Sequence, residues 1–83
     1  MTSQSDTPMV PEFDQADRMR KALRASGVSV AEMADYLGVA RESVGRWING
    51  RTDPSIQTLR LWATRTGVSY EWIVSGTAVA EEK

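Results

Sequence analysis

The sequence of 83 residues contains no cysteine and no histidine. Disulfide bonds, thiolate and imidazole metal sites, and catalytic arrangements built on cysteine or histidine are therefore excluded. No apolar run approaches the roughly 20 residues that a membrane-spanning helix needs. The first residues, MTSQSDTPMVPEF, have neither the basic region nor the long apolar region of a signal peptide. We therefore expect a cytoplasmic protein without a metal, a cofactor or a membrane partner.

Charge is distributed unevenly along the chain, although the net charge at pH 7 is only −1. Residues 18–70 contain nine basic and four acidic side chains, a net charge of +5, whereas the two flanks together carry −6. A basic centre of this kind can face the phosphates of a nucleic acid. Without a supporting motif, however, such a pattern is more often a solvated protein surface.

Local signals divide the chain into five short helices. Ser29 precedes Glu32 by three residues, which is the capping box that opens a helix. Gly27 ends the helix before this box, and the pair Asn49-Gly50 ends the third helix. The expected helices cover residues of about 14–27, 29–37, 41–49, 55–66 and 69–76.

No strand pattern competes with these helices, so the expected fold is all-α, a compact domain of five helices. We place this domain at residues 13–76. Residues 1–12 are polar, contain two prolines and are expected to form a flexible arm. Residues 77–83 are expected to form a frayed tail.

Residues 30–49 have the pattern of a helix-turn-helix. Gly38 lies where the chain turns between two short helices, and this turn often needs the positive φ that glycine adopts at little cost. The second helix of such a pair can lie in the major groove of DNA. The side chains expected to face inward are Met33, Ala34, Leu37, Val39, Val44 and Trp47, with Ile56, Leu59, Trp62 and Ala63 on the fourth helix.

Three segments in the right order resemble the lambda repressor/Cro-like helix-turn-helix domains, also called the XRE family. These segments are residues 30–49 and, after them, NGRTDPSIQTL and GVSYEWIVSG, and the resemblance covers roughly residues 14–76. It implies a lambda repressor-like domain that binds double-stranded operator DNA, usually as a homodimer on a palindromic site. The short chain favours a phage Cro protein or a small immunity repressor, a transcription regulator of a bacterial cell or phage-infected host.

Candidate base contacts lie in the first turn of the third helix and one turn further along the same face. Arg46 is the first choice because arginine can grip both acceptors of guanine, and Glu42 can accept from the amino group of cytosine. Arg41 reads a base or binds phosphate, and Ser43 lies nearby. The alternative is that Glu42 and Arg46 only pair with each other on a solvated face, and we expect this pair in the free protein.

Candidate phosphate contacts lie at helix ends and in the loop after the third helix. The start of the second helix offers Ser29 and free backbone N–H groups. Members of the resembled family contact phosphate through the region after the third helix, which here contains Asn49, Gly50, Arg51 and Thr52. Such contacts position a protein on DNA without reading the sequence.

Several positions are unusual. Gly45 lies inside a helix, where glycine costs about 1 kcal/mol relative to alanine; it either lets the helix approach the groove closely or has no role. Val30 stands where many family members have glutamine, and Ala40 where many have a serine or threonine cap. Leu23 and Ile48 stand where many members have an arginine and a glutamate, and we interpret them as an apolar substitute for that pair.

The surface beyond the DNA contacts leaves two questions open. Leu61 stands where a polar residue is usual in the family and forms, with Tyr70, a candidate dimer seam; a single exposed leucine is also unremarkable. The competing function is an antitoxin or other protein-interaction module with secondary DNA binding, although only seven residues follow Gly76. An enzyme with a small-molecule substrate is not expected, because no nucleophile has a base partner.

Overall fold

The computed structural model describes residues 14–77, and within this range the chain forms helices and no strand. The helices are α1 (Gln15–Ser26), α2 (Val30–Leu37), α3 (Arg41–Ile48), α4 (Ile56–Thr66) and α5 (Tyr70–Ser75). The expected all-α fold of five helices is confirmed. None of these helices is long and apolar enough to cross a membrane. The expected arm, and the expected tail apart from Thr77, lie outside the described residues.

Side-chain caps explain where most of the helices begin. Asp14 caps α1 and Ser29 caps α2, each in a complete capping box, because their side chains accept from the backbone three residues on and receive a carboxylate in return. Ser55 and Ser69 cap α4 and α5 in the simpler way. The exception is α3, which follows Ala40 and has no side-chain cap. The recognition helix expected from the sequence is therefore the one whose first turn is held least by its own sequence.

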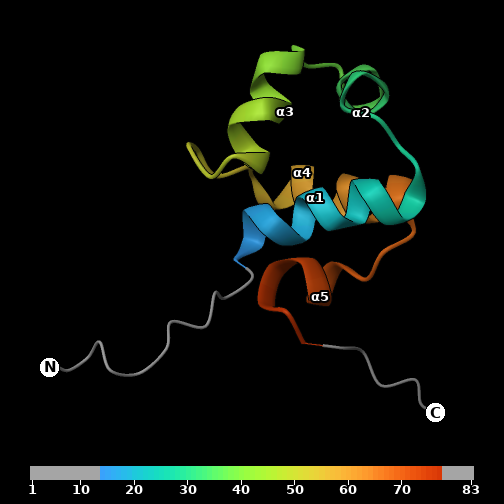
Figure 1. The fold of residues 1–83 in the computed structure, drawn as a ribbon, viewed down its shortest axis with the longest axis vertical. Coiled ribbons are helices and arrows are strands. Elements are labelled where there is room, and N and C mark those ends of the chain that lie inside the picture. Colours follow the sequence, from blue (N-terminus) through green and yellow to red (C-terminus); the bar gives the residue numbers. More distant parts are fainter. Residues whose placement is uncertain (1–13, 78–83) are drawn as a thin grey trace, which may run out of the picture.

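Two helices form the centre of the domain, and the other three cover them. Figure 1 shows α1 and α4 side by side in the middle of the molecule, with α2 and α3 on one side and α5 on the opposite side. The contacts that join α1 to α3 and α2 to α4 fix the helix-turn-helix on the central pair. As a result, the outer side of α3 is turned away from α5.

The core lies between these layers and is formed by side chains from all five helices. Trp62 of α4 is fully buried, and its indole N–H donates to the backbone carbonyl of Met19 on α1 at 3.2 Å. Trp47 of α3 packs against it edge to face, with ring centroids 6.5 Å apart. The buried cluster contains Met19, Ala22, Leu23, Val28, Met33, Ala34, Val44, Leu59, Trp62 and Ile73. Burial of this shared cluster holds helices that are individually too short to be stable in water.

Two of the side chains expected to face inward do not. Val39 is 37% exposed, because it follows the turn at Gly38 and lines a surface hollow between α2 and α3 instead of the core. Ile56 is 60% exposed, because it is the first residue of α4 and lies one turn before Leu59, where the buried face of the helix begins. The expected burial of Met33, Ala34, Val44, Leu59 and Trp62 is confirmed, and Leu37, Trp47 and Ala63 are partly buried against the core.

Arg18 of α1 fastens α5 to the central pair. Its Nε donates to the carbonyl of Ile73 at 2.8 Å, and its Nη2 donates to the carbonyl of Val74 at 3.0 Å. The last carbonyls of a helix have no partner within the helix, so a guanidinium at this end satisfies both their hydrogen bonding and their partial negative charge. Arg18 was counted among the basic residues that could face phosphate, and the structure assigns it this internal role instead.

Candidate nucleic-acid interface

The turn between α2 and α3 fixes the angle at which α3 is presented. Gly38 has a φ of 73°, and its N–H donates to the carbonyls of Ala34 at 2.8 Å and Asp35 at 3.2 Å. The N–H of Val39 also donates to the carbonyl of Ala34, at 3.0 Å. A side chain at Gly38 would be strained by this left-handed conformation, so the predicted need for glycine at the turn is confirmed.

The far end of α3 is held by an arginine of α1. Arg20 donates to the carbonyl of Ile48, the last residue of α3, and forms an ion pair with Asp17 on its own helix. After α3, the N–H of Arg51 donates to the carbonyl of Arg46 at 2.9 Å and folds the loop back along the helix. This role of Arg20 could not be read from the sequence, because its two partners are 28 residues apart in one case and local in the other.

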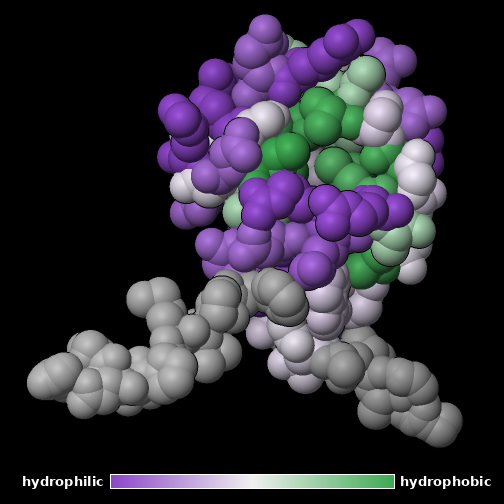
Figure 2. All heavy atoms as spheres, in the orientation of Figure 1, coloured by the Kyte–Doolittle hydropathy of each residue, from purple (hydrophilic) through white to green (hydrophobic). Residues whose placement is uncertain are grey.

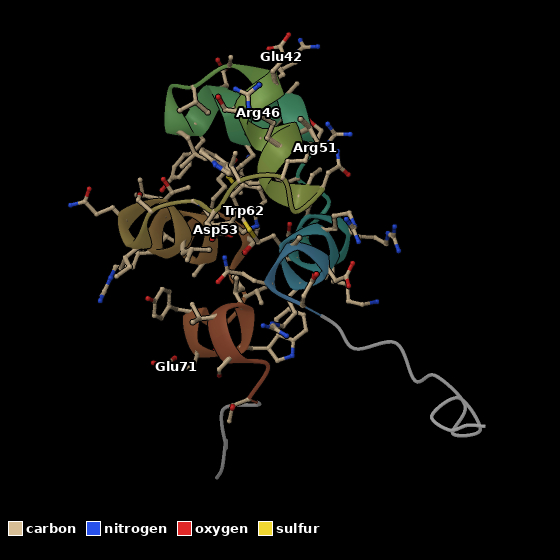
Figure 3. The ribbon with its side chains drawn as sticks, turned by 90° about the vertical axis from the view of Figure 1, so that its left-hand side faces the viewer. Glu42, Arg46, Arg51, Asp53, Trp62 and Glu71 are labelled. Carbon is tan, nitrogen blue, oxygen red and sulfur yellow. The ribbon has the colours of Figure 1, made fainter. Side chains whose placement is uncertain are left out.

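Three of the four candidate base-contacting side chains are exposed on the outer side of α3. These are Arg41, Glu42 and Arg46, whereas Ser43 is partly buried. In Figure 3, Glu42, Arg46 and Arg51 follow one another along the same side of α3 and its loop, and Glu71 of α5 lies at the opposite end of the molecule. Figure 2 shows hydrophilic residues along this outer edge of α3 and hydrophobic ones in the dip between α3 and α2.

The expected ion pair between Glu42 and Arg46 is absent from the part of the chain that the structure describes. The salt bridge found there joins Arg20 and Asp17. A pair four residues apart on an exposed helix face is worth only about 0.2–0.5 kcal/mol, which is too little to hold two long side chains in one geometry. Both side chains are therefore extended and available to another molecule.

A shallow hollow on the outer side of α3 brings several candidate contacts together. It has a volume of about 290 Å³ and is lined by Glu42, Gly45, Arg46, Asn49 and Arg51. We call this hollow the Gly45 notch. It unites two candidate base contacts and two candidate phosphate contacts around one glycine. Of the other candidate phosphate contacts, Gly50 and Thr52 are exposed in the loop that follows.

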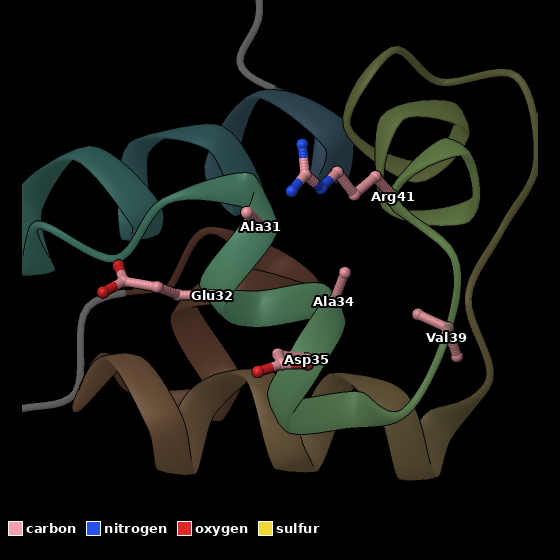
Figure 4. Close-up of a pocket in the computed structure, with 6 residues that line it drawn as sticks. All are labelled: Ala31, Glu32, Ala34, Asp35, Val39 and Arg41. Atoms are coloured by element: carbon pink, nitrogen blue, oxygen red, sulfur yellow. The ribbon is translucent and has the colours of Figure 1, made fainter.

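A second hollow lies on the other side of the start of α3, against α2. It has a volume of about 340 Å³ and is lined by Ala31, Glu32, Ala34, Asp35, Val39 and Arg41, and we call it the α2 hollow. Figure 4 shows Arg41 extending from the first turn of α3 across this hollow toward Ala31. Arg41 and Arg46 therefore point toward different hollows.

The start of α2 is an electrostatically closed unit. The N–H of Ser29 donates to Glu32 Oε1 at 2.8 Å, and the N–H of Glu32 donates to Ser29 Oγ at 3.0 Å. Hydrogen bonds from the backbone and then the side chain of Ser29 lower the pKa of the Glu32 carboxyl, and the charge of Arg65 acts in the same direction. A phosphate contact by Ser29 stays a prediction, and it requires this carboxylate to give up a donor.

The two residues of the candidate dimer seam have different surroundings. Leu61 is 44% exposed, whereas Tyr70 is half-buried under Arg60, whose Cζ lies 5.1 Å from the centre of the tyrosine ring. Successive residues of a helix point about 100° apart, so Leu61 does not share the direction of Arg60. Leu61 shares a face with Arg65, four residues on, whose charge acts on Glu32 of α2. The seam stays a prediction.

Comparison with known proteins now adds to this geometry. The family model for helix-turn-helix domains matches residues 19–73, which include parts or all of the five helices described above. The chain belongs to the helix-turn-helix family. The resemblance drawn from its sequence is thereby confirmed, and the surfaces around α3 become those of a helix-turn-helix domain's second helix.

Two relatives of this helix-turn-helix domain have printed names of one kind. The SPbeta prophage-derived uncharacterized HTH-type transcriptional regulator YonR of Bacillus subtilis (strain 168) is 33% identical over 61 residues, which are 74% of this chain and 56% of that protein. An uncharacterized HTH-type transcriptional regulator of Haemophilus influenzae is 42% identical over 53 residues, 64% of this chain and 22% of that protein. The chain thus spans about half of the first relative and about a fifth of the second. No solved structure matches the chain significantly.

Proposed function

We propose that this protein is a sequence-specific DNA-binding transcriptional regulator, a Cro-like protein or small repressor of phage or prophage origin. It occupies operator DNA by placing α3 in the major groove and acts in the cytoplasm of a bacterial or phage-infected cell. It acts as a binding protein and not as an enzyme. The relative named as prophage-derived supports the phage origin, and both relatives are named as transcriptional regulators.

The observation that carries the proposal is the unpaired, exposed row of Glu42 and Arg46 on α3. Arginine recognises guanine through two acceptors, and glutamate accepts from the amino group of cytosine. Side chains that make no ion pair with each other in the free protein lose nothing by turning toward base edges. Arg41, on the α2 side, is the third candidate, for a base or a phosphate.

The test is selection of bound duplexes from a random-sequence library, followed by sequencing, at two salt concentrations. We compare the wild-type protein with Arg46→Ala and with Arg24→Ala, a control that removes the same charge from an exposed position on α1. We expect the wild type to enrich a motif containing G·C pairs. Arg46→Ala relaxes one of these positions by about 1–3 kcal/mol, and Arg24→Ala leaves the motif unchanged.

Other outcomes have definite meanings. Binding that enriches no motif and falls steeply with salt is attraction to phosphate alone, and it contradicts sequence-specific recognition. A motif that both arginine variants leave unchanged contradicts base reading by Arg46. Co-purification with another protein, together with weak DNA binding, favours a protein-interaction module instead.

Homodimer formation on a two-fold operator is part of the proposal, with Leu61 and Tyr70 as its expected contacts. An enriched palindrome supports it, because a two-fold dimer mirrors the symmetry of its site. We expect Leu61→Asp or Tyr70→Asp to shift binding from the full palindrome to single half-sites, measured by gel shift. Equal, cooperative binding by these variants and by the wild type assigns the seam to other residues.

A further inference from the structure

The two hollows that flank α3 differ in charge. The α2 hollow has one basic side chain, Arg41, against the carboxylates of Glu32 and Asp35. The Gly45 notch has two basic side chains against one carboxylate, and the amide of Asn49 adds a hydrogen-bond donor. A phosphate is therefore attracted to the notch and repelled from the α2 hollow. The difference gives the two sides of α3 different roles toward a duplex.

The fold itself does not require the glycine at the floor of the notch. Gly45 lies in the middle of α3, is not among the glycines with positive φ, and a Cβ built there meets no atom within 4 Å. Alanine would fit and would stabilise the helix by about 1 kcal/mol. What the missing side chain provides is open space between Arg46 and Arg51, directly at the helix backbone.

We propose that one sugar–phosphate strand of bound DNA runs through the Gly45 notch, in contact with the backbone of α3. A phosphate of this strand binds Arg51 and Asn49 on the loop side of the notch. Arg46, on the other wall, points past the strand toward the bases. This inference rests on the proposed function and deepens it, because it names the side of the recognition helix along which the strand passes and the residue that permits the close approach.

The first experiment separates space from stability. Gly45→Ala and Gly45→Leu both introduce good helix formers, so both variants are expected to melt at or above the wild-type temperature. Leucine fills the notch, and we expect Gly45→Leu to bind the selected operator about tenfold to a hundredfold more weakly, as overpacking of an interface implies. Ala25→Leu, at an exposed position of α1, is the matched control and binds as the wild type does.

The results divide clearly. Operator binding by Gly45→Leu equal to that of the wild type overturns the inference, because a filled notch cannot hold a strand. Loss of binding together with a lower melting temperature also counts against it, since the space argument requires a stable variant. If the wild type binds no duplex, the proposed function fails and this inference with it, so the two failures are distinguishable.

A second experiment identifies the phosphate. Single phosphates of the operator are replaced in turn by neutral methylphosphonates, and the affinity of the wild type is compared with that of Arg51→Ala. We expect one position at which neutralisation weakens the wild type but not Arg51→Ala, and the salt slope of Arg51→Ala to be lower by about one phosphate contact. If Arg51→Ala responds as the wild type does at every position, no phosphate lies at the notch.

Discussion

The attachment of α5 through Arg18 gives a prediction that the structure makes quantitative. α5 has only six residues, and its one buried side chain is Ile73. Two carbonyls at its end accept from the Arg18 guanidinium, at 2.8 and 3.0 Å. Replacing Arg18 by methionine keeps most of the apolar stem and removes both hydrogen bonds and the charge.

The expected loss follows from the burial of each bond. A hydrogen bond to a charged group contributes about 1.5–3 kcal/mol when buried. The bond to Ile73 is partly buried and the bond to Val74 is exposed, so solvent screening reduces the sum. We expect Arg18→Met to lower the free energy of unfolding by about 2 kcal/mol, which corresponds to a fall in melting temperature of about 8–16 °C for a domain of this size.

Urea unfolding, followed by far-ultraviolet circular dichroism and tryptophan fluorescence, measures this loss. Arg51→Met is the control, because it removes the same charge from an exposed loop position whose side chain makes no hydrogen bond in the described part of the chain. Arg18→Lys is expected to recover less than half of the loss, since an ammonium lacks the fork that spans two carbonyls. A stability of Arg18→Met within about 0.5 kcal/mol of the wild type would refute the reasoning.

Three further predictions concern the helix starts and the core. Ala40→Ser supplies the cap that α3 lacks and should raise the free energy of unfolding by about 1 kcal/mol in urea titration. The lowered pKa of Glu32 means that its contribution is complete above the unfolded-state pKa and is lost as pH falls through the folded-state pKa. Between pH 7 and pH 3 the wild type should therefore lose more stability than Glu32→Gln; an equal loss would show that the carboxylate does not stabilise the helix start. Leu23 is 7% exposed and belongs to the core with Ile48 packed against it, so Leu23→Arg should lower stability by about 3 kcal/mol or more, and an unchanged melting temperature would contradict the apolar substitution.

The sequence allowed the helices and the turn to be predicted because their signals are local. The capping boxes at Asp14 and Ser29 and the glycine at position 38 act over three or four residues, and the helix ends in the structure agree with the expected ones to within about two residues. Burial on α2 and α3 was also predicted correctly at Met33 and Val44, because helical periodicity fixes which side chains share a face.

The parts that could not be predicted depend on distant residues or on very small energies. Arg18 and its partner Ile73 are 55 residues apart, and no local pattern connects them. Val39 and Ile56 are apolar and in register with the core, but each lies at an end where the neighbouring layer stops. The absent Glu42–Arg46 pair reflects an interaction that is weaker than the rotamer freedom it would remove.

The small size of the five helices has a consequence for the lifetime of the protein. With six to twelve residues each, none is stable alone, and α3 exists in its presented form only while the common core is intact. A duplex bound at α3 therefore also holds α1, α4 and α5 together, and DNA at a hundredfold excess over its dissociation constant would add about 2.7 kcal/mol to the stability of the whole domain. Molecules seated on an operator would then resist proteases that degrade the unbound population.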